Sequence, residues 1–396
     1  MTPTLNKNMA PETHQTPELG SKFPHMGTTI FTVMSALAAE TGAVNLGQGF
    51  PDFACDPRLI EHVTAAMQEG LNQYPPMAGI LPLREAISAK IKTLHGRHYR
   101  AADEITVTAG ATQGILTAIL AIVRPGDEVI VLEPCYDSYV PNIELAGGVA
   151  VRVPLTPGSF RPDFDAIAKA LSPKTRALLI NSPHNPSATV WTPAEMRQLQ
   201  ALINKTNAFL ISDEVYEHMV FEGQTHQSVA RFPDLAARSF IISSFGKTYH
   251  VTGWKVGFVA APAALSAEFR KVHQFNVFTV NTPMQHGLAR YMADPHPYLE
   301  LPAFYQRKRD LFRAGLKNTR LKLLPSEGSY FQSVDISAVS DLSEADFCHW
   351  LTREIGVAAI PMSAFYSNGF DQHIVRFCFA KKDDTLHKAL DRLIRL

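Results

Sequence analysis

The pattern of hydrophobic positions between about residue 55 and residue 262 switches repeatedly between two periods. Short runs of strand length alternate with longer segments whose apolar residues recur every three to four positions. Several of the short runs are apolar throughout, which is typical of strands that helices bury on both faces. The pattern therefore predicts an α/β fold with a mainly parallel, doubly wound sheet. The expected strands are 104–110, 127–134, 147–155, 175–183, 208–214, 238–245 and 255–262, and the expected helices are 56–70, 81–96, 112–123, 162–171 and 192–206.

The flanking segments predict the domain organisation. Residues 1–22 are polar, lack the apolar core of a secretory signal and are expected to form a mobile tail. Residues 23–54, with a short amphipathic helix at 30–40, are expected to form an arm that packs with a small domain. Residues 55–285 would form the large domain. A long helix at 296–318 and strands near 329–336 and 373–380 predict a smaller α+β domain over 286–396.

Composition narrows the class of protein. The 396 residues include 37 basic and 37 acidic side chains, so net charge favours neither nucleic acid nor an anionic membrane as a partner. No apolar run approaches the roughly 20 residues of a membrane-spanning helix. The four cysteines, Cys55, Cys135, Cys348 and Cys378, form no CxxC pair. They favour a cytoplasmic enzyme with reduced thiols over a disulfide framework or a metal site.

Polar residues follow the predicted strands at the edge where open α/β sheets bind ligands. The segment "AGATQG" is a turn of small residues that enters a helix, and exposed N–H groups there can bind an anion. Ser244 and Lys255 could add a hydroxyl and a positive charge. An ordinary strand-to-helix turn is the alternative. The residues concerned are Gly110, Ala111, Thr112, Tyr136, Asn185, Asp213, Tyr216, Ser244 and Lys247.

Taken singly, most of these residues have an ordinary explanation. Asp213 ends an apolar run and could be a helix cap or half of a structural salt bridge. Asn185 precedes a proline, which is common in turns. Tyr136 and Tyr216 could be packing residues. Lys247 lies in "SSFGKTYHVTGWKVGF", where it either extends to solvent or has its pKa lowered and attacks a carbonyl group.

Together, these groups match the chemical features of pyridoxal 5'-phosphate. That cofactor requires an anion site for its phosphate, a lysine for its aldehyde and a carboxylate for its ring nitrogen. It also requires donors to its phenolic oxygen and an aromatic side chain beside its ring. The chain supplies a candidate for each requirement.

The motifs "NLGQGFPDF", "NSPHNPSATVW", "ISDEVYEH", "SSFGKTYHVTGWKVGF" and "VRFCFAKK" resemble those of the class I/II aminotransferases of PLP fold type I. The resemblance extends from about residue 24 to the C-terminus. Within that family the chain most resembles the branch of bacterial methionine aminotransferases and kynurenine/glutamine aminotransferases. Many relatives carry arginine where Lys255 stands, and lysine keeps the charge but not the two-pronged geometry.

The resemblance implies a role for each candidate residue. Lys247 would bind the cofactor covalently and transfer the substrate proton, and Asp213 would pair with the ring nitrogen. Asn185 and Tyr216 would hydrogen-bond the phenolic oxygen, and Tyr136 would stack on the ring. The phosphate would be held by Gly110, Ala111, Thr112, Ser244 and Lys255.

The resemblance also implies how substrate binds and that the protein is a homodimer. Arg376 would bind the substrate α-carboxylate beside Gly49, although an arginine in "IVRFCF" could instead form a structural ion pair. Tyr74 and Phe278 would reach the partner subunit's site. Ile30, Phe31, Tyr74 and Phe278 make the expected side-chain pocket apolar and aromatic, which favours methionine and aromatic amino acids, kynurenine included, over aspartate.

Alternative functions have recognisable signatures. The same site could mainly eliminate a β-substituent from cysteine conjugates, or act mainly on kynurenine. A transcription regulator with this domain would carry a basic DNA-binding segment before it, where this chain has a short polar tail. A cofactor-free structural relative is disfavoured because Lys247 and Asp213 are both present.

Overall fold

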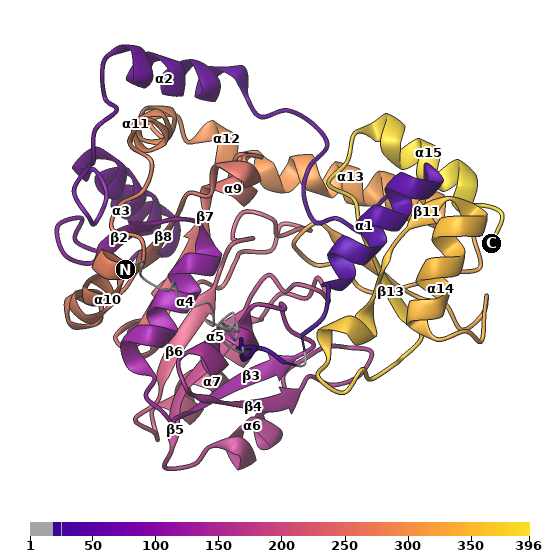
Figure 1. Cartoon of the computed structure of the whole chain (residues 1–396), viewed down its shortest axis with the longest axis horizontal. Helices are drawn as coiled ribbons and strands as arrows, with labels where there is room; N and C mark the ends of the chain where they lie inside the picture. Colours follow the sequence, from indigo (N-terminus) through magenta and orange to yellow (C-terminus); the bar gives the residue numbers. More distant parts are fainter. Residues whose placement is uncertain (1–18, 25) are drawn as a thin grey trace, which may run out of the picture.

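The centre of the molecule is a seven-stranded sheet, seen in a computed structural model that describes residues 19–24 and 26–396 (Figure 1). Only β8 runs antiparallel to its neighbours, so the predicted mainly parallel α/β sheet is confirmed. In spatial order the strands are β2 (Ile105–Thr108), β8 (Gly257–Ala260), β7 (Ser239–Ser244), β6 (Phe209–Asp213), β5 (Thr175–Asn181), β3 (Glu128–Glu133) and β4 (Val149–Pro154).

Helices bury both faces of this sheet. Alternate residues of β3 show the division: Val129 and Val131 pack with helices α4 and α10, whereas Ile130 and Leu132 join the core that includes α6 and α7. Burial of each such aliphatic side chain contributes roughly 1.5–3 kcal/mol, which explains why the strands are apolar on both sides. The helices of this part are α2 (Pro57–Gln68), α3 (Leu81–His95), α4 (Ala111–Ile122), α5 (Tyr139–Leu145), α6 (Phe164–Ala170), α7 (Pro193–Ile203), α8 (Pro233–Ala236), α9 (Phe245–Thr248), α10 (Ala263–Asn276), α11 (Thr282–Tyr291) and α12 (His296–Leu299).

Local signals set several helix ends where the sequence predicts them. Asp56 caps α2 by accepting a hydrogen bond from the Arg58 N–H. Thr192 and Glu195 form a reciprocal capping box at the start of α7. Gly96 ends α3 in the left-handed conformation that glycine adopts without strain.

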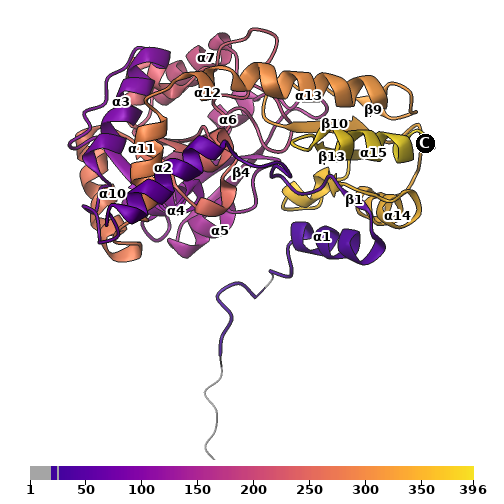
Figure 2. The ribbon, with the colours of Figure 1, turned by 90° about the horizontal axis from the view of Figure 1, so that it is seen from above.

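The C-terminal part is built on a four-stranded antiparallel sheet in the order β12 (Ile360–Pro361), β13 (Ile374–Cys378), β10 (Phe331–Asp335) and β9 (Lys322–Leu323). The N-terminal helix α1 (Ile30–Thr41) lies against this part, and β1 (Val44–Asn45) pairs in parallel with β11 (Val357–Ala358) (Figures 1 and 2). The helices of the C-terminal part are α13 (Leu301–Leu316), α14 (Glu344–Trp350) and α15 (Asp383–Leu393). The assignment of residues 23–54 as an arm of a small domain stays a prediction.

Some elements differ from the sequence-based expectation. The long helix expected over 296–318 is divided at Glu300 into α12 and α13, and Pro302 lies in the first turn of α13, where its missing N–H is not needed. The sequence pattern predicts no helix at the positions of α5, α8, α9, α10, α11, α14 and α15. Residues 1–18 of the predicted tail lie outside the described residues.

The division into domains remains a prediction. Residue 286, where the small domain was expected to begin, falls inside α11, which packs closely against α2. We therefore propose that the boundary lies after α12, because α13 packs against α15 of the C-terminal part. In the part of the chain that the structure describes, no helix is long and apolar enough to cross a bilayer.

Candidate active site

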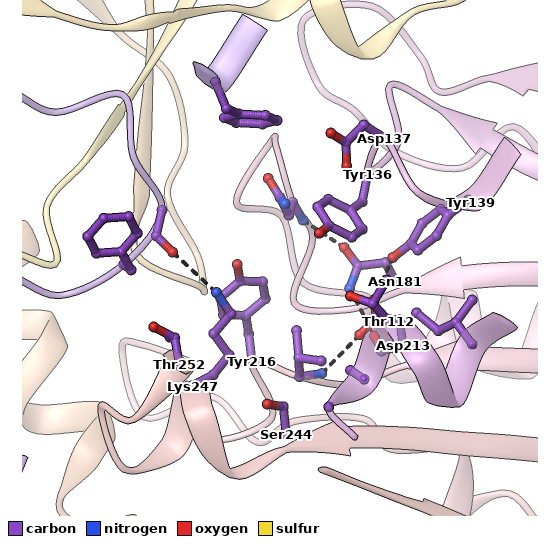
Figure 3. A pocket seen from close by; sticks show the side chains of 18 of the residues that line it. Thr112, Tyr136, Asp137, Tyr139, Asn181, Asp213, Tyr216, Ser244, Lys247 and Thr252 are labelled. Carbon is purple, nitrogen blue, oxygen red and sulfur yellow. Dashed lines mark hydrogen bonds between the residues drawn. The ribbon is translucent and has the colours of Figure 1, made fainter. Parts of the chain in front are cut away.

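A pocket of about 250 Å³ opens at the carboxyl ends of the central strands, where the N-terminal arm and β13 also meet the sheet. Its size is near the lower end of the roughly 300–1,000 Å³ typical of small-molecule pockets. Figure 3 shows side chains from several of these elements around it. The predicted residues that line it are Phe31, Gly49, Gly110, Ala111, Thr112, Tyr136, Asn185, Asp213, Tyr216, Ser244, Lys247, Lys255 and Arg376.

Lys247 projects from α9, the single turn of helix that directly follows β7. Its Nζ donates hydrogen bonds to the Gly49 carbonyl oxygen at 3.2 Å and to the Tyr330 hydroxyl at 2.8 Å. Burial lowers the pKa of the amine to about 8, and the nearby positive charges of Lys255 and Arg376 act in the same direction. About a tenth of Lys247 is therefore neutral and nucleophilic at pH 7, far more than for an ordinary lysine.

Asp213 ends β6 and is almost fully buried. Burial raises the pKa of its carboxyl to about 6. Two donors act in the opposite direction: the Tyr139 hydroxyl at 2.6 Å and the Val215 N–H at 3.2 Å. The Asn181 side chain also donates to the Asp213 carbonyl oxygen, which ties the ends of β5 and β6 together. The arrangement holds a carboxylate at the base of the pocket, ready for a cationic partner.

An anion site lies at the N-terminus of α4. Gly110 precedes the helix with a φ of 80°, and the N–H groups of its first turn have no intrahelical acceptors. The Lys255 amine is close by, since a Cβ built on Gly110 would lie 3.2 Å from Lys255 Nζ. Ser244 lines the same side of the pocket. The helix end, the cation and the hydroxyl together suit a phosphate group.

Arg376 reaches the pocket from the middle of β13 and is only 1% exposed. It donates from Nη1 to the Asn185 side-chain oxygen at 2.6 Å and from Nη2 to the Gly47 carbonyl oxygen at 3.2 Å. Its guanidinium carbon lies 3.9 Å from the Phe331 ring centroid. Burial lowers the pKa of Arg376 to about 10, so the side chain stays charged at neutral pH. No acidic side chain within the described residues forms an ion pair with it.

Aromatic residues form much of the remaining wall. Tyr216 meets the Tyr330 ring edge-on, with centroids 5.1 Å apart. Tyr136 meets Tyr139 in the same way at 5.7 Å. Gly49 allows the close approach of the arm, because a Cβ there would lie 3.1 Å from the Phe331 ring and would force that ring to shift. The pocket wall therefore presents aromatic surface between its charged groups.

Three predicted residues lie outside this pocket. Ile30 packs against the core beside it. Tyr74 and Phe278 are 81% and 41% exposed and contact each other, with ring centroids 5.3 Å apart. Their predicted place in a partner subunit's site stays a prediction.

Several residues of the pocket and its surroundings were not predicted from the sequence. Tyr139 lies on α5, a short helix containing Pro141 that the periodicity did not reveal. Asp137 follows Tyr136 directly and lines the pocket. Tyr330 precedes β10 and touches Lys247 from the C-terminal part. Of these residues only Asp137 lies directly beside a predicted site residue, and that adjacency was the available signal.

A buried ion pair links the segments that carry the pocket residues. Glu217, one residue after Tyr216, accepts hydrogen bonds from Lys90 at 2.7 Å and from Ser243 at 2.6 Å. Burial by itself would raise the pKa of Glu217, but the charge of Lys90 holds that pKa well below its ordinary value. The turn after β6 and the end of β7 are thereby fixed relative to α3.

Comparisons with known proteins agree with this geometry. The family model described as aminotransferase class I and II matches residues 41–393. The chain is 52% identical to a methionine aminotransferase of Escherichia coli, over 95% of this chain and 98% of the relative. It is 37% identical to kynurenine–oxoglutarate transaminase 3 of Rattus norvegicus, over 91% and 86%.

Solved structures give the same result. A structure from E. coli, described as identifying a methionine aminotransferase function, matches with a TM-score of 0.95 at 52% identity, covering 96% of this chain and all of that one. An N-succinyldiaminopimelate aminotransferase from Mycobacterium tuberculosis matches with a TM-score of 0.91 at 40% identity, with 96% and 100% covered. The chain therefore belongs to the class I and II aminotransferase family.

Proposed function

We propose that this aminotransferase uses pyridoxal 5'-phosphate (PLP) and moves the amino group of methionine or an aromatic amino acid to a 2-oxo acid. The observation that carries the proposal is the joint position of three groups in one pocket. These are the amine of Lys247 with its lowered pKa, the buried carboxylate of Asp213 and the guanidinium of Arg376.

The residues present fit PLP. The phosphate would bind at the start of α4, with Lys255 and Ser244, and the carboxylate of Asp213 would hold the ring nitrogen protonated. Asn185 and Tyr216 would contact the phenolic oxygen, and Tyr136 would cover the ring. When bound, PLP supplies an electron sink that makes the substrate Cα proton acidic.

The side chains of the pocket then have distinct tasks. Arg376 would bind the substrate α-carboxylate through the two nitrogens that now contact Asn185 and the Gly47 carbonyl. Its contacts hold the guanidinium in a fixed plane, which reduces the entropy lost on binding. The neutral Lys247 amine would take the proton from the substrate Cα, and its lowered pKa suits that task near neutral pH. Two such half-reactions, first with an amino acid and then with a 2-oxo acid, complete the transfer.

The pocket wall favours apolar side chains. Phe31, Ile115, Val215 and Phe331 contribute apolar surface, and Arg376 is the only arginine among the described residues that line the pocket. A second arginine to bind a dicarboxylate side chain is therefore not present in this wall. The names of the E. coli and rat relatives support the same substrate range.

Oligomeric state and cellular location are also proposals. We infer a homodimer in which Tyr74 and Phe278, both exposed, reach the partner's site. We also infer a cytoplasmic location, which the unpaired state of all four cysteines supports.

A substrate panel tests the proposed function. Visible absorption of the PLP-loaded protein should change on adding L-methionine alone and return on adding a 2-oxo acid. We expect kcat/KM for methionine and phenylalanine to exceed that for aspartate by at least about tenfold, because a buried polar group without a partner costs about 1–3 kcal/mol. A higher kcat/KM for aspartate, or a protein whose absorption never changes, would contradict the proposal. Including kynurenine and a cysteine conjugate in the panel ranks the two alternative activities.

Replacing Arg376 with lysine should weaken substrate binding. The Arg376→Lys variant keeps the charge but loses the fork that can hold both carboxylate oxygens. We expect kcat/KM for methionine to fall about 10²-fold, mostly through KM, at unchanged affinity for PLP. Steady-state kinetics and PLP titration measure the two effects. Arg313→Lys, an arginine outside the pocket that contacts Leu324 and Gln332, is the control. An unchanged KM would contradict the assigned role.

A further inference from the structure

The charged side chains around the pocket differ in the partners that they contact. Asp213 accepts from Tyr139, Arg376 donates to Asn185, Lys247 donates to Tyr330, and Lys255 lies at the start of α4. Asp137 is different, because no side chain among the described residues forms an ion pair or a hydrogen bond with its carboxylate; burial raises its pKa, and the charge of Arg376 and the backbone N–H groups of Asp137 and Ser138 act in the opposite direction. One carboxylate of the pocket wall therefore has no side-chain partner within the described residues.

Asp137 occupies a fixed place at the mouth of the pocket. It lies between Tyr136 and the start of α5, and the preceding Cys135 N–H donates to the Phe365 carbonyl oxygen at 3.0 Å. In Figure 3 it lies beside Tyr136, across the pocket from Lys247 and Ser244. Its side chain is exposed to solvent on one face and lines the pocket on the other. It also lines the outer hollow beneath residues 22–24 and 26.

Asp137 and Arg376 act on each other electrostatically. Enclosure by the pocket wall raises the pKa of the Asp137 carboxyl, whereas the positive charge of Arg376 lowers it. Both side chains also line the same pocket. A substrate α-carboxylate bound to Arg376 would use that positive charge, and Lys247 and Lys255 would be engaged by the cofactor. The remaining charged side chain of the pocket lining besides Asp213 is Asp137.

We propose that Asp137 restricts the site to substrates with a single carboxylate, by repelling the second carboxylate of dicarboxylic amino acids and 2-oxo acids. This inference rests on the proposed function and adds the class of acceptor to it. Repulsion between like charges is a common means of rejecting a competing ligand. A thioether or an aromatic ring carries no charge and escapes the repulsion. The preferred acceptors are then 2-oxo acids with uncharged side chains.

Two variants of Asp137 change the charge in steps. Asp137→Asn removes it at nearly constant size, and Asp137→Lys reverses it. For each we would measure kcat/KM for L-glutamate relative to L-methionine, and for 2-oxoglutarate relative to the 2-oxo acid of methionine. Asp341→Asn removes an exposed carboxylate from the C-terminal part and is the matched control. We expect both ratios to rise about tenfold in Asp137→Asn, more in Asp137→Lys, and not at all in the control.

A binding measurement separates this inference from the proposed function. Calorimetric titration of the PLP-loaded protein with glutarate and with hexanoate gives a ratio of dissociation constants without any turnover. That ratio should move in favour of glutarate by about tenfold in Asp137→Asn. Kinetic and binding ratios that stay within twofold of the wild type in both variants would overturn the role of Asp137. If the wild type transfers no amino group from any amino acid, the proposed function fails, whereas the calorimetric ratio still tests Asp137.

Discussion

Replacing Lys247 with alanine is expected to reduce amino-group transfer by at least about 10³-fold. The variant lacks both the nucleophile that would hold the cofactor and the base that would take the substrate proton. Single-turnover absorbance of the PLP-loaded protein with methionine measures the rate. Borohydride reduction followed by mass spectrometry measures covalent attachment, which should disappear in Lys247→Ala.

Lys255→Ala is the informative comparison, because Lys255 lines the same pocket eight residues further along the chain. It should keep covalent attachment and bind PLP more weakly, since a phosphate would lose one positive charge. Attachment that persists in Lys247→Ala but disappears in Lys255→Ala would reverse the two assignments. Transfer by Lys247→Ala within tenfold of the wild-type rate would refute the role of Lys247.

Replacing Asp213 with asparagine should have the second-largest effect. The substitution keeps the shape of the side chain but removes the negative charge that would hold the cofactor's ring nitrogen protonated. We expect kcat to fall about 10²–10³-fold at saturating PLP, in the range that mutagenesis finds for one electrostatic contact in an active site. Stopped-flow absorbance with methionine and a PLP titration give the rate and the affinity.

Tyr139→Phe is the matched control for this prediction. It removes only the hydroxyl that donates to Asp213 at 2.6 Å, and with it one of the contacts that lower the pKa of that carboxyl. The pKa of Asp213 should then rise above about 6 in the PLP-free protein, and kcat should fall less than in Asp213→Asn. An Asp213→Asn variant within threefold of the wild-type kcat would show that the charge is dispensable.

Local signals account for the part of the fold that was predicted. Asp56, Gly96 and the pair Thr192 and Glu195 sit at helix ends that the structure reproduces, because capping depends on neighbours in sequence. The antiparallel direction of β8 was not predicted, since an apolar strand has the same side-chain period in either direction. The break between α12 and α13 at Glu300 was not predicted either, because Pro302 is compatible with the first turn of a helix.

The sequence by itself determined the α/β class and the order of polar groups that follow the strands, because both depend on residues that are contiguous in the chain. Only the tertiary structure decided what surrounds those groups. Gly49 and Tyr330 contact Lys247 from positions 198 and 83 residues away. Asn185 meets Arg376 across 191 residues. Such contacts depend on how the arm and the C-terminal part fold back over the sheet, which no local pattern encodes. The burial that lowers the pKa of Lys247 arises only when those segments close around it.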